Sequence, residues 1–236
     1  MAADCDADDE IAGSRERRRR TSTRRRETIN DAGVIHDEAP LHMKTTLLTS
    51  EHYTRSPWKN GGGIFTDIAD AHRAGSATKD WDSLLWRFAT TPIVAPGPFS
   101  FMPGIDRLQM VVGGRGLVLK APGQDFDERE PFTTVRFTGE LAIVTELEAG
   151  PVEVVNLMAR RGAAEIELLA VREPGEWPLS AGTHLIYAVS RDCSIRLNRE
   201  DFAISGGDTL KVELTEASSL ALISGIAVLG SIQLVG

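Results

Sequence analysis

From Met43 onward the chain is a series of short apolar stretches, each bounded by Gly, Pro, Asp or Asn. Clear examples are RLQMVVGG, GLVLK, ELAIVTEL, VEVVNLMA, HLIYAVS, DTLKVEL and LALISGIAV. Stretches of this length, separated by turn residues at close intervals, are typical of an all-β sandwich or barrel. GLVLK and DTLKVEL also alternate apolar and polar residues, which indicates strands with one buried face. The sequence therefore predicts an all-β fold.

Two pairs of these stretches resemble each other and predict an internal repeat. RLQMVVGGRGLVLK (107–120) aligns with HLIYAVSRDCSIRLN (184–198) after one insertion, and RFTGELAIVTEL (136–147) resembles AISGGDTLKVEL (203–214). The glycine turn followed by Asp and alternating apolar residues in the last stretch is typical of a cupin strand pair. Chance similarity between β-rich segments is the alternative explanation.

The repeat and the length of the chain define the predicted domains. Two copies within 236 residues imply two stacked β-barrels or sandwiches, one over 43–165 and one over 166–236. Residues 1–42 contain eight arginines and ten acidic residues, and the arginine block SRERRRRTSTRRRE has no apolar residue and no strand or helix period. Such a composition cannot bury enough apolar surface to fold, so we predict a disordered, arginine-rich tail.

The charge pattern predicts no specific nucleic-acid partner for the folded body, which holds more acidic than basic residues. The arginine block of the tail, SRERRRRTSTRRRE, has no interleaved aromatic residue for base stacking, and the acidic start, DCDADDE, competes for its charge. Docking of nucleic acid or another partner by the tail stays open as a weaker alternative.

Cysteine content and hydropathy bear on the cellular compartment. A disulfide between Cys5 and Cys193 would have to reach from the tail to the body, so we expect reduced thiols in a cytoplasmic protein. No apolar run approaches the roughly 20 residues that span a bilayer, and we predict no membrane association.

The histidines predict no metal site and no other cofactor. Cupin metal sites present two histidines one residue apart, together with a carboxylate and a further histidine. The five histidines of this chain include no such pair: His36, His42, His52, His72 and His184. A metal-dependent oxygenase or isomerase is therefore disfavoured.

Three successive glycines, Gly61, Gly62 and Gly63, stand out in RSPWKNGGGIFTDIAD. A P-loop requires Gly-Lys-Ser/Thr after its glycines, and a dinucleotide fingerprint requires a preceding strand and a following helix, so neither pattern fits. A glycine-rich turn without a ligand is one interpretation. The functional alternative is a site where bare backbone N–H groups converge on an anion.

The residues that precede the glycines favour a small ligand. Lys59 supplies positive charge, Asn60 both a donor and an acceptor, and Trp58 an apolar wall with one N–H. This combination suits a small planar or carboxylate-bearing molecule better than a polymer.

Several motifs together resemble the HutD/Ves family. These are PWKNGGG, then WRFATTPIVAPGPFSFMPGIDR after a gap, and later GPVEVVNLMARRG, all in the family order. The resemblance extends from about Met43 to the C-terminus and implies a cupin-like bicupin fold. It also implies an association with histidine utilisation in bacteria, and a binding or regulatory role towards an intermediate such as formiminoglutamate or urocanate.

The sequence departs from the family pattern at two places. Family members often carry Thr-Arg-Glu soon after the glycines, where this chain has Phe65, Thr66 and Asp67 after Ile64. Met102 also stands where Phe is usual. We expect Phe65 in particular to change the shape of the pocket, so that the family's ligand need not carry over.

Three further stretches supply candidate ligand-binding residues. Strand alternation places Trp86 and Arg87 on opposite faces, and an inward Arg87 would need an internal acid or a ligand carboxylate as partner. In PGIDRL we predict that Arg107 contacts a carboxylate and that Asp106 positions it, unless Asp106 pairs with an arginine only to hold the turn. Asn156 lies between apolar neighbours and is predicted as a further polar group of the pocket.

Two functions fit these residues. The first is a non-catalytic protein that binds a small anionic metabolite, with the glycine backbone, Lys59 and Arg107 holding its carboxylate. The second is a metal-independent isomerase or hydrolase that uses Lys59 as a base, which requires that this lysine be desolvated or placed beside positive charge. No Ser-His-Asp or Cys-His set is evident in either case. A homodimer formed through strand contacts is compatible with both.

Overall fold

The structure is a computed structural model that describes residues 43–61 and 63–235, and its regular elements are β-strands apart from one short 3-10 turn, η1 (Ser50–His52). The predicted arginine-rich tail at 1–42 and the middle glycine, Gly62, lie outside the described residues. The all-β prediction is confirmed. Within the described ranges there is no helix with the length and apolarity that crossing a membrane requires.

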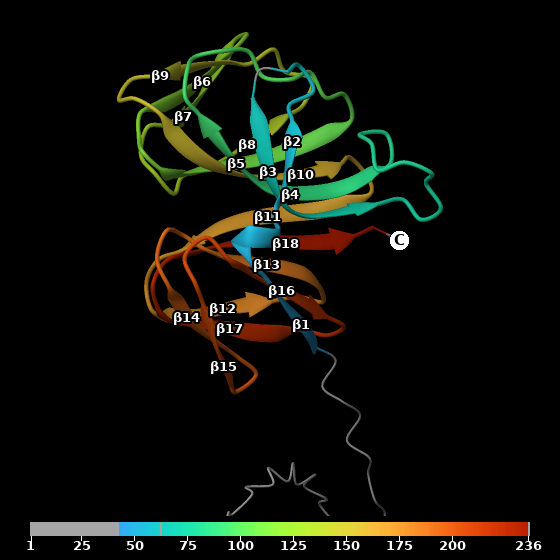
Figure 1. Cartoon of the computed structure of the whole chain (residues 1–236), viewed down its shortest axis with the longest axis vertical. Coiled ribbons are helices and arrows are strands. Elements are labelled where there is room, and N and C mark those ends of the chain that lie inside the picture. The colour runs from blue at the N-terminus through green and yellow to red at the C-terminus, as the bar shows by residue number, and fades with distance from the viewer. Residues whose placement is uncertain (1–42, 62, 236) are drawn as a thin grey trace, which may run out of the picture. The chain divides into compact units, whose positions relative to one another are not determined.

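The strands form four antiparallel sheets (Figure 1). The six-stranded sheet has the order β2 (Thr54–Pro57), β3 (Ile64–His72), β4 (Leu84–Ile93), β10 (Val152–Arg160), β5 (Ile105–Gly113), β8 (Thr134–Thr138). A three-stranded sheet has the order β7 (Gln124–Glu128), β6 (Leu117–Ala121), β9 (Val144–Leu147). The five-stranded sheet has the order β1 (Met43–Leu48), β16 (Thr209–Leu214), β13 (Gly182–Ala188), β18 (Ala227–Leu234), β11 (Ala164–Val171). The last sheet has the order β12 (Gly175–Leu179), β17 (Ser218–Ser224), β14 (Cys193–Leu197), β15 (Glu200–Ile204).

The order of strand pairing occurs twice. The run β4-β10-β5-β8 recurs as β11-β18-β13-β16, and β9-β6-β7 recurs as β17-β14-β15. This equates β5 and β6 with β13 and β14, in agreement with the predicted alignment of 107–120 on 184–198. The second alignment, of 136–147 on 203–214, is displaced by one strand, because the pairing equates β8 rather than β9 with β16. The pattern of strand, glycine turn and strand occurs at successive hairpins. It therefore does not determine which hairpin of one copy corresponds to which hairpin of the other.

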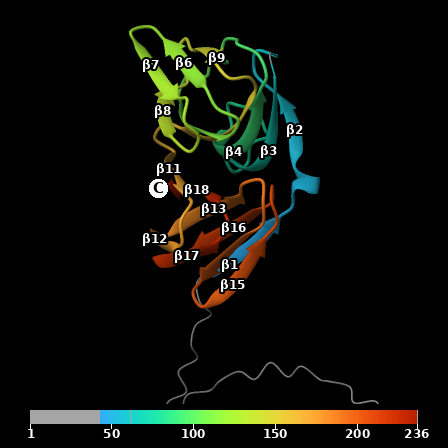
Figure 2. The same ribbon diagram turned by 90° about the vertical axis from the view of Figure 1, so that its left-hand side faces the viewer.

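Strand β1 belongs to the sheet built mostly from the C-terminal strands. It pairs along its full length with β16, from Met43 opposite Leu214 to Leu48 opposite Thr209 (Figure 2). The chain then enters the six-stranded sheet through β2. The four sheets are open in the described residues, so the closed bicupin barrels and the division at residue 165 stay predictions.

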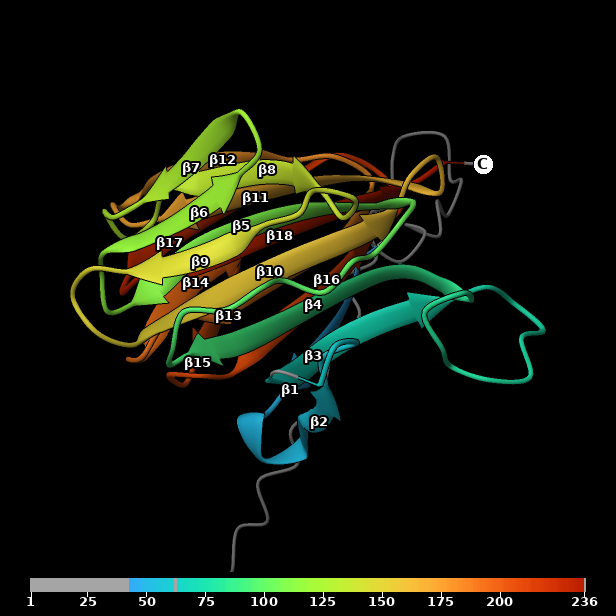
Figure 3. The ribbon, with the colours of Figure 1, turned by 90° about the horizontal axis from the view of Figure 1, so that it is seen from above.

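Alternation along β10 divides the core into two sides. Val155 and Leu157 point towards the five-stranded sheet, where they join a buried cluster that also contains Leu185 and Val228. Gly230 on β18 permits this contact, because a Cβ atom there would lie 3.0 Å from the ring of Phe88. Figure 3 shows β5, β10, β4 and β3 side by side, with β13 and β18 of the five-stranded sheet behind them. The opposite face of the six-stranded sheet carries the polar residues that define the site.

Candidate functional site

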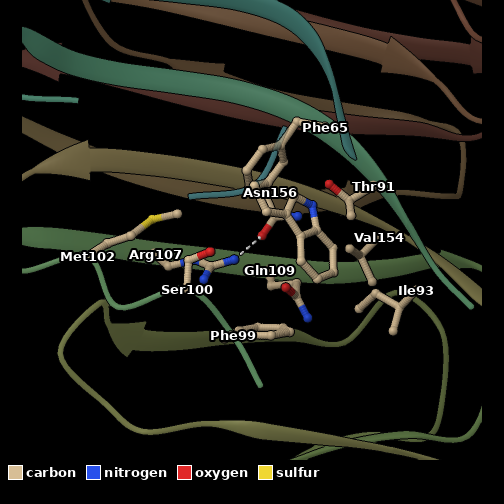
Figure 4. Close-up of a pocket in the computed structure, with 11 residues that line it drawn as sticks. Phe65, Thr91, Ile93, Phe99, Ser100, Met102, Arg107, Gln109, Val154 and Asn156 are labelled. Carbon is tan, nitrogen blue, oxygen red and sulfur yellow. Dashed lines mark hydrogen bonds between the residues drawn. The ribbon is translucent and has the colours of Figure 1, made fainter. Parts of the chain in front are cut away.

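One pocket lies on the face of the six-stranded sheet that points away from the five-stranded sheet, which we call the inner face. It contains most of the polar residues of that face (Figure 4). It is lined by Trp58, Phe65, Thr91, Ile93, Phe99, Ser100, Met102, Arg107, Gln109, Val154 and Asn156. We call it the Arg107 pocket. The space between its lining atoms amounts to about 270 Å³, part of which is open to solvent. The side chains are close enough together to leave room for only about one water molecule. A larger ligand must displace side chains of the lining.

Strand register brings the central polar residues together. Asn156 on β10 lies opposite Gln109 on β5, and Met158 lies opposite Arg107. On the other side of β10, Val154 lies opposite Thr91 of β4. Because side chains alternate along a strand, Arg107, Gln109 and Asn156 share the inner face. All three are buried.

Arg107 is the charged group at the centre of the pocket, and it is only 4% exposed. Its Nη2 donates a hydrogen bond of 2.9 Å to Oδ1 of Asn156. Its guanidinium carbon lies 4.7 Å from the ring centre of Phe99 and 5.0 Å from that of Phe137, within the range of a cation–π contact. Burial lowers the pKa of Arg107 to about 10, so it remains a cation at neutral pH.

A buried carboxyl group lies behind the pocket. Oε2 of Glu128, at the end of β7, accepts a hydrogen bond of 2.8 Å from Nε2 of Gln109. Glu128 is fully buried and does not line the pocket itself. Burial raises its pKa to about 8, although the hydrogen bond from Gln109, the charge of Arg107 and the backbone N–H of Val111 all oppose this rise.

Several buried polar atoms of this region have no hydrogen-bond partner among the described residues. In the pocket lining they are Nε1 of Trp58, Oγ1 of Thr91, Nε of Arg107 and Oε1 of Gln109. Buried donors and acceptors are normally paired, and leaving one unpaired costs about 1–3 kcal/mol. A group of such atoms around one pocket is the arrangement expected of a site that receives a polar ligand.

Gly61 and Gly63 lie in the turn between β2 and β3, where Trp58 N donates a hydrogen bond of 2.9 Å to Gly63 O. Gly61 has φ +72°, a conformation that a residue with a side chain rarely adopts. At Gly63, a Cβ atom would lie 2.5 Å from the Trp58 ring. Gly63 therefore permits the indole to pack against the backbone at the pocket, which accounts for this glycine without any anion.

Asn60 and Lys59 occupy different environments from Trp58. Asn60 ties the hairpin to the segment before β5, because its Nδ2 donates to Pro98 O at 2.9 Å and its backbone N to Ser100 Oγ at 3.2 Å. Lys59 is exposed and does not line the pocket. The structure brings neither residue together with Arg107.

Arg87 points inward and is paired with an internal acid. It lies 3.4 Å from Asp67, measured from Nε to Oδ1, and each of these two side chains is 11% exposed. Its guanidinium carbon lies 4.4 Å from the Trp81 ring centre. Burial raises the pKa of Asp67, against a hydrogen bond from Ser56 and the charge of Arg87. This pair adjoins the Arg107 pocket, with Phe65 between them, but does not line it.

Asp106 faces away from the pocket. Its Oδ1 accepts hydrogen bonds of 3.0 Å from Nε and 2.8 Å from Nη2 of Arg161. Arg161 also donates to Glu140, whose second partner is the backbone N–H of Gly104. Asp106 thus takes the alternative considered for it, an arginine pair that holds the turn before β5.

Sequence reasoning identified Trp58, Arg107 and Asn156, all of which line the pocket. It missed Gln109, Thr91 and the buried Glu128. One signal was available, because Gln109 follows Arg107 by two residues within an apolar stretch and so shares its face of the strand. The two flagged departures from the family pattern, Phe65 and Met102, both line the pocket.

The histidines of the described residues have ordinary polar partners. His72 contacts Ser83 Oγ at 2.9 Å, and His184, which is buried, contacts Ser231 Oγ and Ser180 O, each at 2.9 Å. Within residues 43–61 and 63–235 no group of three or more His, Cys, Asp or Glu side chains is placed to hold a metal ion.

Comparison with known structures supports the fold. HutD from Pseudomonas fluorescens SBW25, described as a formate-condition structure, is 24% identical with a TM-score of 0.68, over 82% of this chain and 100% of that one. Protein Ylba from E. coli is 12% identical with a TM-score of 0.56, over 89% and 94% of the two chains. At these identities the likeness shows the fold alone, an all-β, cupin-like fold as predicted.

Comparison of sequences identifies the family. A Pseudomonas putida protein, described as an uncharacterized 21.2 kDa protein in the hutC 3′ region, is 29% identical over 168 residues, which are 71% of this chain and 86% of the relative. The HutD family model matches residues 50–229. The chain belongs to the HutD family, which is linked to the histidine-utilisation locus.

Proposed function

We propose that this protein binds a small anionic metabolite in the Arg107 pocket, as a non-catalytic binding or regulatory protein. The main observation behind the proposal is the environment of Arg107. A cation that is 4% exposed normally forms a direct ion pair, yet Arg107 donates to neutral Asn156 and its Nε has no partner within the described residues. The buried Glu128 acts on Arg107 by its charge, but it accepts its hydrogen bond from Gln109. A ligand carboxylate would supply a direct ion pair and an acceptor for Nε.

The remaining lining favours a ligand with a small planar end. Trp58, Phe65 and Phe99 provide aromatic walls, while Nε1 of Trp58 and Oγ1 of Thr91 offer unpartnered polar atoms. Family membership and the hutC-region relative point to histidine catabolism. We therefore propose a ligand related to formiminoglutamate or urocanate. The cytoplasmic location and a homodimer stay predictions.

No observation favours the enzyme alternative. A lysine base must be desolvated or placed near positive charge to work at neutral pH, whereas Lys59 is exposed and lies outside the pocket lining. We therefore do not assign Lys59 a role in the pocket.

The proposal is tested by thermal unfolding with histidine, urocanate, formiminoglutamate, formylglutamate and glutamate. A ligand at a hundred times its Kd stabilises the fold by about 2.7 kcal/mol, which raises Tm by roughly 5–10 °C for a chain of this size. Arg107→Met should abolish the shift and retain a folded protein. Arg196→Met serves as control, because Arg196 is an exposed arginine paired with Asp201 on β14 and β15. An unchanged shift in Arg107→Met would refute the assignment.

A further inference from the structure

Four buried side chains form two hydrogen-bonded pairs beside one another at the base of the Arg107 pocket. Arg107 donates to Asn156, and Gln109 donates to Glu128. Asn156 and Gln109 lie directly opposite each other on β10 and β5. Three of the four line the pocket, while Glu128 does not line it and accepts a hydrogen bond from Gln109, which does. Gln109 therefore connects the buried carboxyl group with the space that a ligand would enter.

The orientation of the Gln109 amide decides what the pocket offers. While Nε2 donates its hydrogen bond to Glu128, the amide presents Oε1 to the pocket. This oxygen is buried and has no partner in the described part of the chain. A carbonyl oxygen in the pocket beside Arg107 repels a carboxylate. Turning the amide over would present two N–H donors instead, but Oε1 would then face Glu128. An ionised carboxylate only accepts hydrogen bonds, so this orientation requires a protonated Glu128.

We propose that Glu128 acts through Gln109 as a proton-linked positioning residue for anion binding, an inference that rests on the proposed function. In the bound state Glu128 carries a proton and donates it in a hydrogen bond to Gln109 Oε1. Gln109 Nε2 then donates to the ligand carboxylate together with Arg107. In the free state at high pH, the ionised Glu128 accepts a hydrogen bond from Gln109 Nε2. Gln109 Oε1 then faces the pocket and repels an anion.

The charges around Glu128 agree with this coupling. Arg107 is the one charged side chain that acts on Glu128 among the described residues, and the other groups facing it are the Gln109 amide and the backbone N–H of Val111. Burial raises the pKa of Glu128 to about 8, so it is mostly protonated at pH 6 and mostly ionised at pH 9. A ligand carboxylate adds negative charge and raises that pKa further. Binding therefore takes up a proton, and affinity falls as pH rises.

The experiment measures the Kd of acetate and formate by calorimetry from pH 6 to 9, in chloride-free buffer at constant ionic strength. Both anions are ionised throughout this range. If only the protonated form binds, affinity falls about tenfold between pH 6 and 9 for a pKa of about 8. Glu128→Gln removes the charge and keeps a donor towards Gln109, so it should bind across the range with the affinity of the wild type at pH 6.

Controls separate this inference from the proposal on which it rests. Glu146→Gln alters an exposed glutamate on β9 that pairs with Lys120, and it should keep the wild-type pH dependence. Gln109→Leu should weaken binding at pH 6 and flatten the profile, because the donor to the ligand is lost. Failure of acetate and formate to bind at pH 6 would contradict a carboxylate site. Binding that is equally tight at pH 6 and 9, or a slope that persists in Glu128→Gln, would overturn the role of Glu128 alone.

Discussion

At the scale of single residues, Phe65 separates the buried Arg107 from the partly buried Arg87. Its ring centre lies 6.1 Å from that of Trp58, in the Arg107 pocket, and 6.3 Å from that of Trp81, on which Arg87 stacks. We expect Phe65→Ala to join the pocket with the space beside Arg87 and to favour glutarate over acetate by tenfold or more, while costing about 3–5 kcal/mol of stability. The Kd ratio of the two anions measures this. Phe65→Leu, which retains most of the volume, should leave the ratio near that of the wild type, and an unchanged ratio in Phe65→Ala would show that Phe65 is not the barrier.

The outer glycines of the hairpin differ in what they contribute. Gly61 needs its positive φ but has no atom within 4 Å of an added Cβ, whereas an added Cβ at Gly63 would collide with Trp58. We expect Gly61→Ala to cost about 1 kcal/mol and leave Trp58 in place. Gly63→Ala should displace the indole, change tryptophan fluorescence and weaken ligand binding. Equal fluorescence spectra for the two variants would contradict this assignment of Gly63.

At the scale of elements, β1 links the start of the described chain to the C-terminal strands. Met43 and Leu48 pack against two different core clusters, and the strand covers the edge of β16. Deleting residues 1–48 should therefore lower Tm and promote aggregation through the exposed edge. Deletion of residues 1–42 is the control, since it keeps β1 whole. The same Tm for both truncated proteins would mean that β1 contributes nothing to the fold.

The elements also show which features of the structure sequence patterns can predict. Alternation and turn residues predicted the strands, because both signals are local. Arg107 and Asn156 were predicted in the same way, from the residues next to them in the sequence. Cross-strand neighbours are not local: that Gln109 lies opposite Asn156 follows from register, and that Glu128 lies behind Gln109 follows from the three-stranded sheet covering the pocket. The same limit explains the displaced repeat alignment and the assignment of Asp106, whose partner Arg161 is 55 residues away.

At the scale of the whole molecule, Glu128 couples stability to pH. Its pKa rises from an ordinary 4.5 to about 8 on folding, so the folded protein holds its proton more tightly than the unfolded chain. The free energy of unfolding that this group contributes is full below pH 4.5 and is lost as pH rises towards 8. Glu128→Gln should remove this loss. The Tm difference between variant and wild type should therefore be more favourable to the variant at pH 9 than at pH 5, by roughly 5 °C or more. A Tm difference independent of pH would contradict the buried state of this carboxyl group.

The central claim, that Arg107 receives a carboxylate, is tested most directly on Arg107 itself. Its Nε–H has no partner within the described ranges and is shielded by Phe99 and Phe137, so its ¹H–¹⁵N NMR signal should be observable and can be assigned by its absence in Arg107→Met. On titration with the best ligand of the thermal panel, we predict a downfield ¹H shift of this signal that follows the same binding curve. A signal that does not move at saturation would show that the ligand binds elsewhere.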